Sequence, residues 1–199
     1  MPQSLKPRVR RTPDDAKQTF LACAETLLVE DGLTAVQMRA VARLAHVTDA
    51  AIAHHFGNRD GLLKALMDHV VAKVRRAIRT ITDRWTGAPD GFRKLIGDLD
   101  ALYAQGYAEL AQALTHSGWR DTGPPLLKPV IDVLIKQNAH PDTEANDIRR
   151  VMAALHMDLA LYPLYGAAFR RSVGLRSKRE RAKQLDWWAA SIEQMLKAR

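Results

Sequence analysis

Apolar side chains recur at helical spacing along nearly the whole chain. From residue 14 onward they return every three or four positions, and no alternating strand pattern or internal repeat interrupts them. This pattern predicts an all-α protein of about nine helices. We expect helices over residues 14–31, 34–45, 49–55, 58–85, 90–105, 105–116, 125–138, 143–171 and 177–197.

Several expected helix ends carry residues that cap or interrupt helices. Gly32 is expected to end the first helix in a left-handed conformation, and residues 34–37 have the form of a capping box that opens the second. Thr48 is a good N-cap for the third helix, and Asn58 for the fourth. Pro163 falls inside the eighth helix, which we expect it to kink.

The second and third helices, separated by three or four residues, have the form of a helix-turn-helix. The third lies in the stretch VTDAAIAHHF at residues 47–56, where Val47, Ile52 and Phe56 have the spacing to anchor it to its neighbours. Its alanines would let the outward face approach the major groove of DNA closely. A helix this short is not stable alone, so its neighbours must present it. Short alanine-rich helices also occur in ordinary helical bundles, and spacing alone leaves both interpretations open.

The chain is basic, with 30 Lys and Arg against 22 Asp and Glu among 199 residues, a formal net charge of +8. This balance favours an anionic partner, nucleic acid or a membrane surface, although it also serves solubility. Residues 1–60 hold eight Lys and Arg against seven Asp and Glu, a net of only +1. The strongest basic run of the chain lies over residues 170–183. We interpret it as a solvated face rather than as a nucleic-acid site.

Residues 1–13 are expected to form a flexible basic arm. Such arms enter a minor groove or follow phosphates, and a solubilising tail is the equally good alternative. The cations of this arm are Lys6, Arg8, Arg10 and Arg11.

Other features restrict the class of protein. The single cysteine, Cys23, excludes an internal disulfide framework and lies in an apolar run typical of buried packing. No apolar stretch reaches the ~20 residues that span a bilayer, and the N-terminus lacks the apolar core of a signal peptide. We expect a soluble cytoplasmic protein without a membrane partner. No phosphate loop, metal-ligand spacing or nucleophile motif is present, so we expect no catalytic residue, metal or cofactor; a small helical hydrolase or binding protein is the alternative.

The stretch DGLTAVQMRAVARLAHVTDAAIAHHFGNRDGLL, within a match over about residues 17–66, resembles the DNA-binding domain of the tetracycline-repressor (TetR) family of transcriptional regulators. Three positions depart from the family pattern. His46 replaces the usual glycine, Ala53 replaces a phosphate-contacting tyrosine, and residues 34–37 lack paired threonines. If the turn needs positive φ at His46, the strain is about 1 kcal/mol. The matching residues are Gly32, Arg39, Val41, Ala42, Ala45, Val47, Thr48, His55, Phe56, Arg59, Asp60, Gly61, Leu62 and Leu63.

The resemblance and the helix-turn-helix geometry together nominate the residues that contact DNA. Thr48, Asp49 and Ala50 are expected to point outward at the start of the recognition helix, with His54 and His55 nearer the DNA backbone. Arg39 and Arg59 are the expected phosphate contacts. Asp49 either favours its helix N-terminus or accepts from a cytosine amine. The full set is Gln37, Arg39, Thr48, Asp49, Ala50, Ala51, His54, His55 and Arg59.

The resemblance also implies a division of the chain. Residues 14–58 would form the helix-turn-helix domain, and residues 59–199 a helical domain that binds an effector and forms a homodimer. The last two long helices have apolar stripes, and Leu161, Leu164 and Phe169 spread apolar surface more widely on one of them. Monomer core is the alternative interpretation of these stripes. The expected dimer residues are Leu155, Leu159, Tyr162, Leu185, Trp188, Ile192 and Met195.

An effector pocket in the C-terminal domain is implied in the same way. Its candidate lining is largely apolar and aromatic, which suggests an apolar or aromatic small molecule, although each residue alone also fits a structural core. The candidates are Trp85, Phe92, Tyr103, Tyr107, His116, Trp119, Met152, His156 and Tyr165. We therefore expect a dimeric repressor that binds a palindromic operator in double-stranded DNA and is released by an effector. The alternative is a helical dimer of the same family that has lost operator binding and binds a ligand or a protein.

Overall fold

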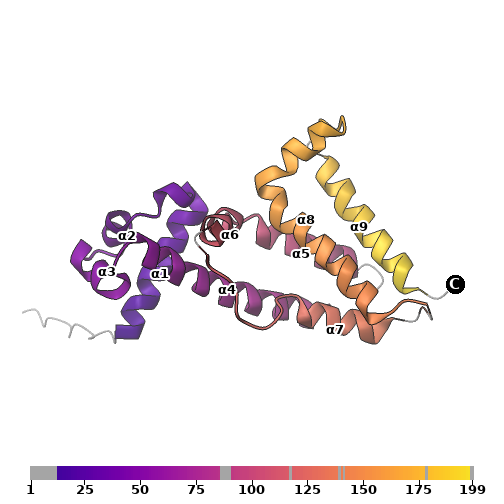
Figure 1. Cartoon of the computed structure of the whole chain (residues 1–199), viewed down its shortest axis with the longest axis horizontal. Coiled ribbons are helices and arrows are strands. Elements are labelled where there is room, and N and C mark those ends of the chain that lie inside the picture. Colours follow the sequence, from indigo (N-terminus) through magenta and orange to yellow (C-terminus); the bar gives the residue numbers. More distant parts are fainter. Residues whose placement is uncertain are drawn as a thin grey trace, which may run out of the picture. The chain divides into compact units, whose positions relative to one another are not determined.

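The computed structural model describes residues 13–85, 91–116, 118–138, 140, 142–177 and 179–197. Within these ranges the chain is all-helical, with nine α-helices, one 3-10 helix and no strand (Figure 1). The α-helices are α1 (Pro13–Asp31), α2 (Met38–Leu44), α3 (Asp49–Phe56), α4 (Arg59–Arg84), α5 (Gly91–Tyr103), α6 (Tyr107–His116), α7 (Lys128–Gln137), α8 (Ala145–Ser172) and α9 (Glu180–Leu196), and the 3-10 helix is η1 (Leu33–Ala35). The all-α prediction is confirmed, and the predicted arm lies outside the described residues apart from Pro13.

One predicted helix start is wrong. Residues 34–37 do not form a capping box, because Leu33–Ala35 form the 3-10 turn and α2 begins only at Met38. The side-chain amide of Gln37 instead donates a hydrogen bond to the carbonyl of Thr34, at 2.9 Å. Gln37 therefore precedes α2 in an extended conformation and caps it without a side-chain hydrogen bond.

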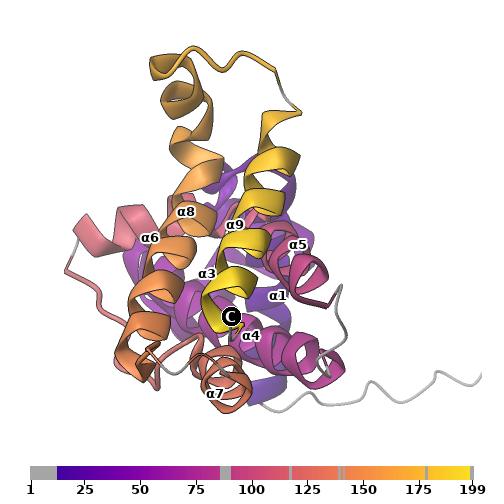
Figure 2. The ribbon, with the colours of Figure 1, turned by 90° about the vertical axis from the view of Figure 1, so that its right-hand side faces the viewer.

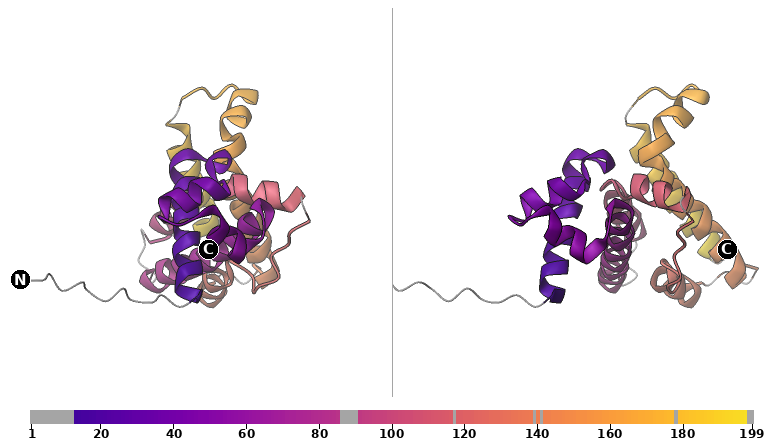
Figure 3. Two further views of the ribbon diagram at one scale, coloured as in Figure 1. Left: turned by 90° about the vertical axis from the view of Figure 1, so that its left-hand side faces the viewer. Right: turned by 60° about the vertical axis from the view of Figure 1, so that its left-hand side comes forward.

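The first compact unit, residues 1–69, is built on α1, α2, α3 and the first turns of α4 (Figure 3). Its core contains Phe20, Leu28, Val41 and Ile52, each at most 5% exposed. Val47, which we expected to anchor α3, is 37% exposed, because it lies in the turn before the helix. Cys23 is half-buried.

The second unit, residues 70–199, contains the remainder of α4 and the helices that follow. In it α8 packs against α5, α6 and α7, and α9 packs against α5. Figure 2 shows α8 and α9 running side by side to the segment that connects them. The two units divide within α4, whereas we placed the domain boundary at the start of this helix. The first turns of α4 belong to the first unit because their side chains contact it. Arg59 donates to the carbonyls of Val36 and Leu33, and His69 lies beside Glu25 of α1.

The longest helix, α8, continues through Pro163 without a break in its assigned span. Its ribbon changes direction in the C-terminal half (Figure 1), as expected for a helix with an internal proline. At its other end Glu144 and Asp147 form a reciprocal capping box. Residues 145–172 therefore belong to one uninterrupted helix.

None of the helices in the described ranges has the length and apolar character needed to cross a membrane.

Candidate functional site

The turn between α2 and α3 has a backbone conformation that few residues adopt. His46 has a φ of 55°, in the left-handed region, and is the only described non-glycine residue with positive φ. The amide of Val47 donates to the carbonyl of Ala42 at 3.0 Å, which closes the turn. The turn thus does need a positive φ at the position where the family usually has glycine, and histidine adopts it here.

The short helix α3 has one buried and one exposed side. Thr48 caps it by accepting a hydrogen bond from the amide of Ala51, at 3.3 Å, as predicted. Ile52 is fully buried and Phe56 is 8% exposed, so they hold the helix against the rest of the unit. The exposed residues are Thr48, Asp49, Ala50, Ala53 and His54. The outward face therefore carries small side chains, one carboxylate and one imidazole.

His55 lies on a different side of α3 from His54. Its ring is half-buried and contacts Phe20 of α1 edge-on, with the ring centroids 5.3 Å apart. Ala51 is half-buried as well. Of the two adjacent histidines, only His54 is exposed on this helix.

An exposed ion pair joins the starts of α2 and α3. Arg39 Nε donates to Asp49 Oδ2 at 3.2 Å, and the two side chains are 90% and 55% exposed. A pair this exposed contributes little to stability, of the order of 0–1 kcal/mol. Its significance is positional, because it places a guanidinium beside the N-terminus of α3. Sequence analysis nominated both residues but did not predict their pairing.

Arg59 has a structural role that differs from the phosphate contact we expected. Its Nε donates to the carbonyl of Val36 at 2.9 Å, and Nη2 donates to the carbonyl of Leu33 at 3.1 Å. The side chain is half-buried and tethers the first turn of α4 to the 3-10 turn before α2. These hydrogen bonds occupy two of the three guanidinium nitrogens within the chain.

Arg43 and His46 also belong to the exposed surface of this unit, and sequence analysis did not nominate them as contacts. Arg43 lies in the last turn of α2. The signal available in the sequence was its place on the polar side of the second helix, four residues after Arg39. Together with Gln37, which is exposed, they extend the polar surface around α3.

The candidate effector residues of the second unit are distributed over several contacts. Phe92, Tyr103, Tyr107 and Met152 are buried, Trp85, Trp119 and His156 are half-buried, and His116 and Tyr165 are exposed. Trp85 packs on Phe92 with ring centroids 5.5 Å apart, and Tyr165 accepts a hydrogen bond from Gln112 at 2.5 Å. His116 Nδ1 lies 2.8 Å from the carbonyl of Gln112 on its own helix. Two pairs within this set are in direct contact, Trp85 with Phe92 and Tyr103 with His156.

Tyr103 and His156 form a polar pair between α5 and α8. The phenol oxygen lies 2.6 Å from His156 Nε2. Burial lowers the pKa of His156 below its ordinary value of 6.5, and burial also raises the pKa of Tyr103. A neutral imidazole accepting from the phenol O–H satisfies both groups.

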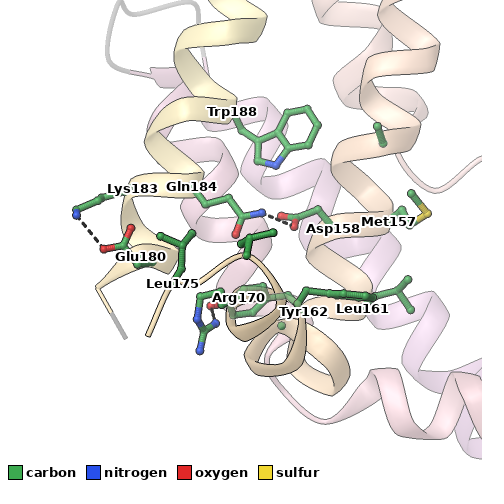
Figure 4. Close-up of a pocket in the computed structure, with 14 residues that line it drawn as sticks. Met157, Asp158, Leu161, Tyr162, Arg170, Leu175, Glu180, Lys183, Gln184 and Trp188 are labelled. Atoms are coloured by element: carbon green, nitrogen blue, oxygen red, sulfur yellow. Dashed lines mark hydrogen bonds and ion pairs between the residues drawn. The ribbon is translucent and has the colours of Figure 1, made fainter. Parts of the chain in front are cut away.

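A cavity of about 730 Å³ lies between α8 and α9. None of the nine candidate effector residues lines it. Figure 4 shows Trp188 of α9 pointing between the two helices, and Gln184 reaching Asp158 of α8. The lining consists of Ala154, Met157, Asp158, Leu161, Tyr162, Gly166, Phe169, Arg170, Val173, Leu175, Glu180, Lys183, Gln184 and Trp188.

A charged network joins α5, α8 and α9 beside this cavity. Arg181 pairs with Asp100 and, through Nη1, with Asp158 at 2.7 Å, and its side chain is only 11% exposed. Its guanidinium also stacks on the Tyr162 ring, 3.7 Å from the centroid. One residue of the basic run at 170–183 therefore serves the internal structure rather than the solvated face.

The predicted dimer residues divide into two groups. Leu155, Leu159, Leu185 and Ile192 are buried within a single chain, so they belong to its core. Tyr162, Trp188 and Met195 are half-buried. The apolar surface that stays exposed lies beside them and includes Met157, Leu161, Phe169, Val173 and Trp187, which are 39–71% exposed. Sequence analysis anticipated the exposed Leu161 and Phe169 from the wide apolar spread of α8.

Residues 20–66 match the family model described as bacterial regulatory proteins, tetR family. No curated protein gives a significant match. Solved structures with a similar fold include a TetR-family transcriptional regulator from Pectobacterium atrosepticum (21% identity, TM-score 0.61, covering 95% of this chain and 96% of that one). Others are TetR from Acinetobacter baumannii AYE (19%, 0.58, 92% and 98%) and apo ActR from Streptomyces coelicolor (17%, 0.55, 96% and 98%).

Proposed function

We propose, from the match of residues 20–66 to the tetR family of bacterial regulatory proteins, that this chain belongs to that family and is a homodimeric repressor which binds a palindromic operator and is released by a small molecule. The family consists of transcriptional regulators rather than enzymes, and the N-terminal helix-turn-helix is its DNA-binding domain. The homodimer, the operator and the effector are the parts of this function that we infer.

The observation that carries the proposal is the two-sided character of α3. Ile52 and Phe56 are buried and pack the helix against the rest of the unit. The exposed side chains of Ala50 and Ala53 are short, so the backbone of the outer face can come close to base edges. Thr48 satisfies a free amide at the helix start, which is the end that normally reaches the bases. The outer face of this helix has no role in the core.

We assign base contacts to the start of α3 and backbone contacts to its surroundings. Asp49 holds Arg39 through Nε, which leaves both terminal nitrogens of that guanidinium available for a guanine edge or a phosphate. His54 and Gln37 are placed for the DNA backbone, while His55 and Ala51 support the helix. Arg59 supports the 3-10 turn and is not part of this interface.

A homodimer follows from two considerations. A palindromic site needs two recognition helices about one DNA turn (~34 Å) apart. The side chains of Met157, Phe169 and Val173 are 61–71% exposed beside the α8–α9 cavity, and contiguous apolar surface of this kind marks an interface. We propose that α8 and α9 of a second copy cover it, with Tyr162, Trp188 and Met195 at its edge.

For the effector we retain an apolar or aromatic small molecule bound in the second unit. Its walls would come from the buried candidates Phe92, Tyr107 and Met152, with the Tyr103–His156 pair as the polar group that fixes orientation. In one conformation of the dimer the two recognition helices have the spacing of the operator, and in another they do not. An effector that binds the second conformation more tightly would release the DNA. Helix α4, which carries residues of both units, would transmit the change.

A selection of bound duplexes from random DNA, repeated across salt concentrations, tests the operator. We expect a palindromic consensus whose binding weakens steeply with salt. Asp49→Asn is expected to change the preferred base pair at one position per half-site, by about 1–3 kcal/mol. The matched control is Asp60→Asn, an exposed acid at the start of α4, which should keep the consensus.

Failure of this experiment has a defined meaning. If no duplex binds specifically at low salt, the result supports the alternative function. In that alternative the protein is a dimer that binds a ligand or a protein and has no operator. The absence of a hydrogen-bonding side chain at the exposed Ala53 favours that alternative.

A further inference from the structure

A second, smaller pocket of about 280 Å³ lies within the second unit between α4 and α7. One wall is α4, with Arg75 and Arg79 one turn apart. The remaining walls are a proline-rich loop and the start of α7. They consist of Pro124, Pro125, Leu126, Lys128, Pro129 and Asp132. Three of its eight lining side chains are cationic, and four are prolines or leucine.

Two of the three cations already have partners. Arg75 Nη2 donates to both carboxylate oxygens of Asp121, at 2.7 and 2.6 Å, and to the carbonyl of Pro124 at 3.2 Å. Lys128 pairs with Asp132 at 2.5 Å in an exposed ion pair. Burial acts to raise the pKa of the Asp121 carboxyl, but hydrogen bonds from Arg75 and the Gly123 amide, together with the Arg75 charge, outweigh it and lower this pKa. Asp121 is therefore a charged anchor that fixes the Arg75 guanidinium.

The loop is shaped to hold Arg75 closely. A Cβ atom added at Gly123 would meet the Arg75 guanidinium, so a larger residue there would require the end of the arginine side chain to shift. Arg75 Nε is buried and has no hydrogen-bond partner within the part of the chain that the structure describes. An unpaired buried donor of this kind is costly unless a partner is supplied. Arg75 is thus a rigid part of the wall with unused donor capacity.

Arg79 supplies the free charge of the pocket. It is exposed on α4, and no hydrogen bond or ion pair joins it to another of the described residues. Lys128 and Pro129 open the ten-residue helix α7, whose N-terminal dipole adds positive potential on the same side. Arg75 and Lys128 are already paired with carboxylates, whereas Arg79 has no such partner among the described residues. The pocket therefore has one unpaired positive charge and suits a single anionic group.

We infer that this pocket binds a small carboxylic acid, with its carboxylate on Arg79 and its compact apolar body against the prolines and Leu126. The volume lies just below the roughly 300–1,000 Å³ of pockets for drug-sized ligands, which restricts the ligand to a small molecule. The rigid proline walls favour a compact apolar body over a long flexible chain. This site is separate from the α8–α9 cavity and from the aromatic effector candidates, and it does not depend on operator binding.

Calorimetric titration of the full chain with benzoate, benzamide and inorganic phosphate tests the inference at constant ionic strength. Benzoate carries the carboxylate, benzamide has the same shape without the charge, and phosphate has the charge without the apolar body. We expect saturable benzoate binding at one site per chain and at least about tenfold weaker benzamide binding, equivalent to 1.4 kcal/mol. Phosphate is expected to bind more weakly than benzoate.

Variants locate the binding. Arg79→Gln should weaken benzoate at least about tenfold. The matched control is Arg76→Gln, because Arg76 is an exposed arginine on the same helix that does not line the pocket. Circular dichroism and thermal midpoints confirm that both variants fold. The inference is overturned if benzoate shows no saturable binding up to about 10 mM, if benzamide binds as well as benzoate, or if Arg76→Gln weakens benzoate as much as Arg79→Gln. Phosphate binding stronger than that of benzoate would also overturn it.

Discussion

At the scale of single residues, the Tyr103–His156 pair makes a titratable group part of the packing of α5 against α8. The phenol oxygen lies 2.6 Å from His156 Nε2, and burial lowers the pKa of this imidazole. The folded protein holds the pKa of His156 below 6.5, whereas the unfolded chain has the ordinary value, so the unfolded state binds more protons between these two values. The free energy of unfolding therefore falls as the pH drops through 6.5 toward the lowered pKa.

His156→Gln is expected to remove this contribution. Urea unfolding of the wild-type protein at pH 7.5, 6.5 and 5.5 should show a loss from this group that approaches about 1.4 kcal/mol per pH unit below 6.5. The variant should lose less stability over the same range, even if it is less stable at pH 7.5. His116→Gln, an exposed histidine on α6, controls for the loss of a histidine. Identical pH dependence in wild type and His156→Gln would refute the assignment.

At the scale of secondary-structure elements, Arg59 connects α4 to the segment that precedes α2. Its two hydrogen bonds satisfy the carbonyls of Val36 and Leu33. Hydrogen bonds from a charged donor are stronger than neutral ones, although partial exposure reduces their contribution. The orientation of the helix-turn-helix therefore depends on a side chain that lies outside it in sequence.

Arg59→Met should lower the free energy of unfolding of the protein by about 1–3 kcal/mol, because two carbonyls lose their donors. Chemical denaturation measures this change. Arg43→Met is the matched control, since Arg43 is exposed on α2 and has no partner among the described residues. If Arg59→Met instead leaves stability unchanged and reduces the salt dependence of DNA binding by about one ion, Arg59 contacts phosphate after all.

At the scale of the whole molecule, the proposed dimer rests on the exposed apolar surface beside the α8–α9 cavity. Met157 and Phe169 are more than 60% exposed, whereas Leu155 and Leu159 of the same helix are fully buried. Helix α8 therefore uses one side for the core of its own chain, and we propose that its exposed side meets a second copy. The core interpretation of the stripe is confirmed for Leu155 and Leu159, whereas the dimer interpretation stays a prediction.

Met157→Glu combined with Phe169→Glu should convert the dimer to a monomer, because burying two carboxylates in an apolar interface is unfavourable. Sedimentation velocity at micromolar concentration measures the change in mass. Operator affinity should fall with it, since two linked recognition helices bind far more tightly than one. Val29→Glu is the control, because Val29 is 48% exposed on α1 and is not one of the residues of this surface. A wild-type protein that sediments as a monomer would exclude the proposed dimer.

The sequence by itself determined the helices and the recognition motif. The helical period depends on neighbours three and four residues apart, so the spans of α5 to α9 differ from expectation by only a few residues. Local chemistry likewise identified Thr48 as a cap, whereas the positive φ of His46 was only raised as a condition. The capping box predicted at residues 34–37 was wrong, because the same few residues can instead form a 3-10 turn.

Only the tertiary structure decided which side chains meet. Arg59 and Val36 are 23 positions apart, Tyr103 and His156 are 53 apart, and Arg75 and Asp121 are 46 apart. No periodic signal encodes such pairs, because they depend on how whole helices pack. The same packing buried Leu155 and exposed Met157 on one helix, and it formed a basic pocket from two helices and a proline loop. Periodicity reports which residues are apolar, whereas the shape of the neighbouring helices decides what each of them contacts.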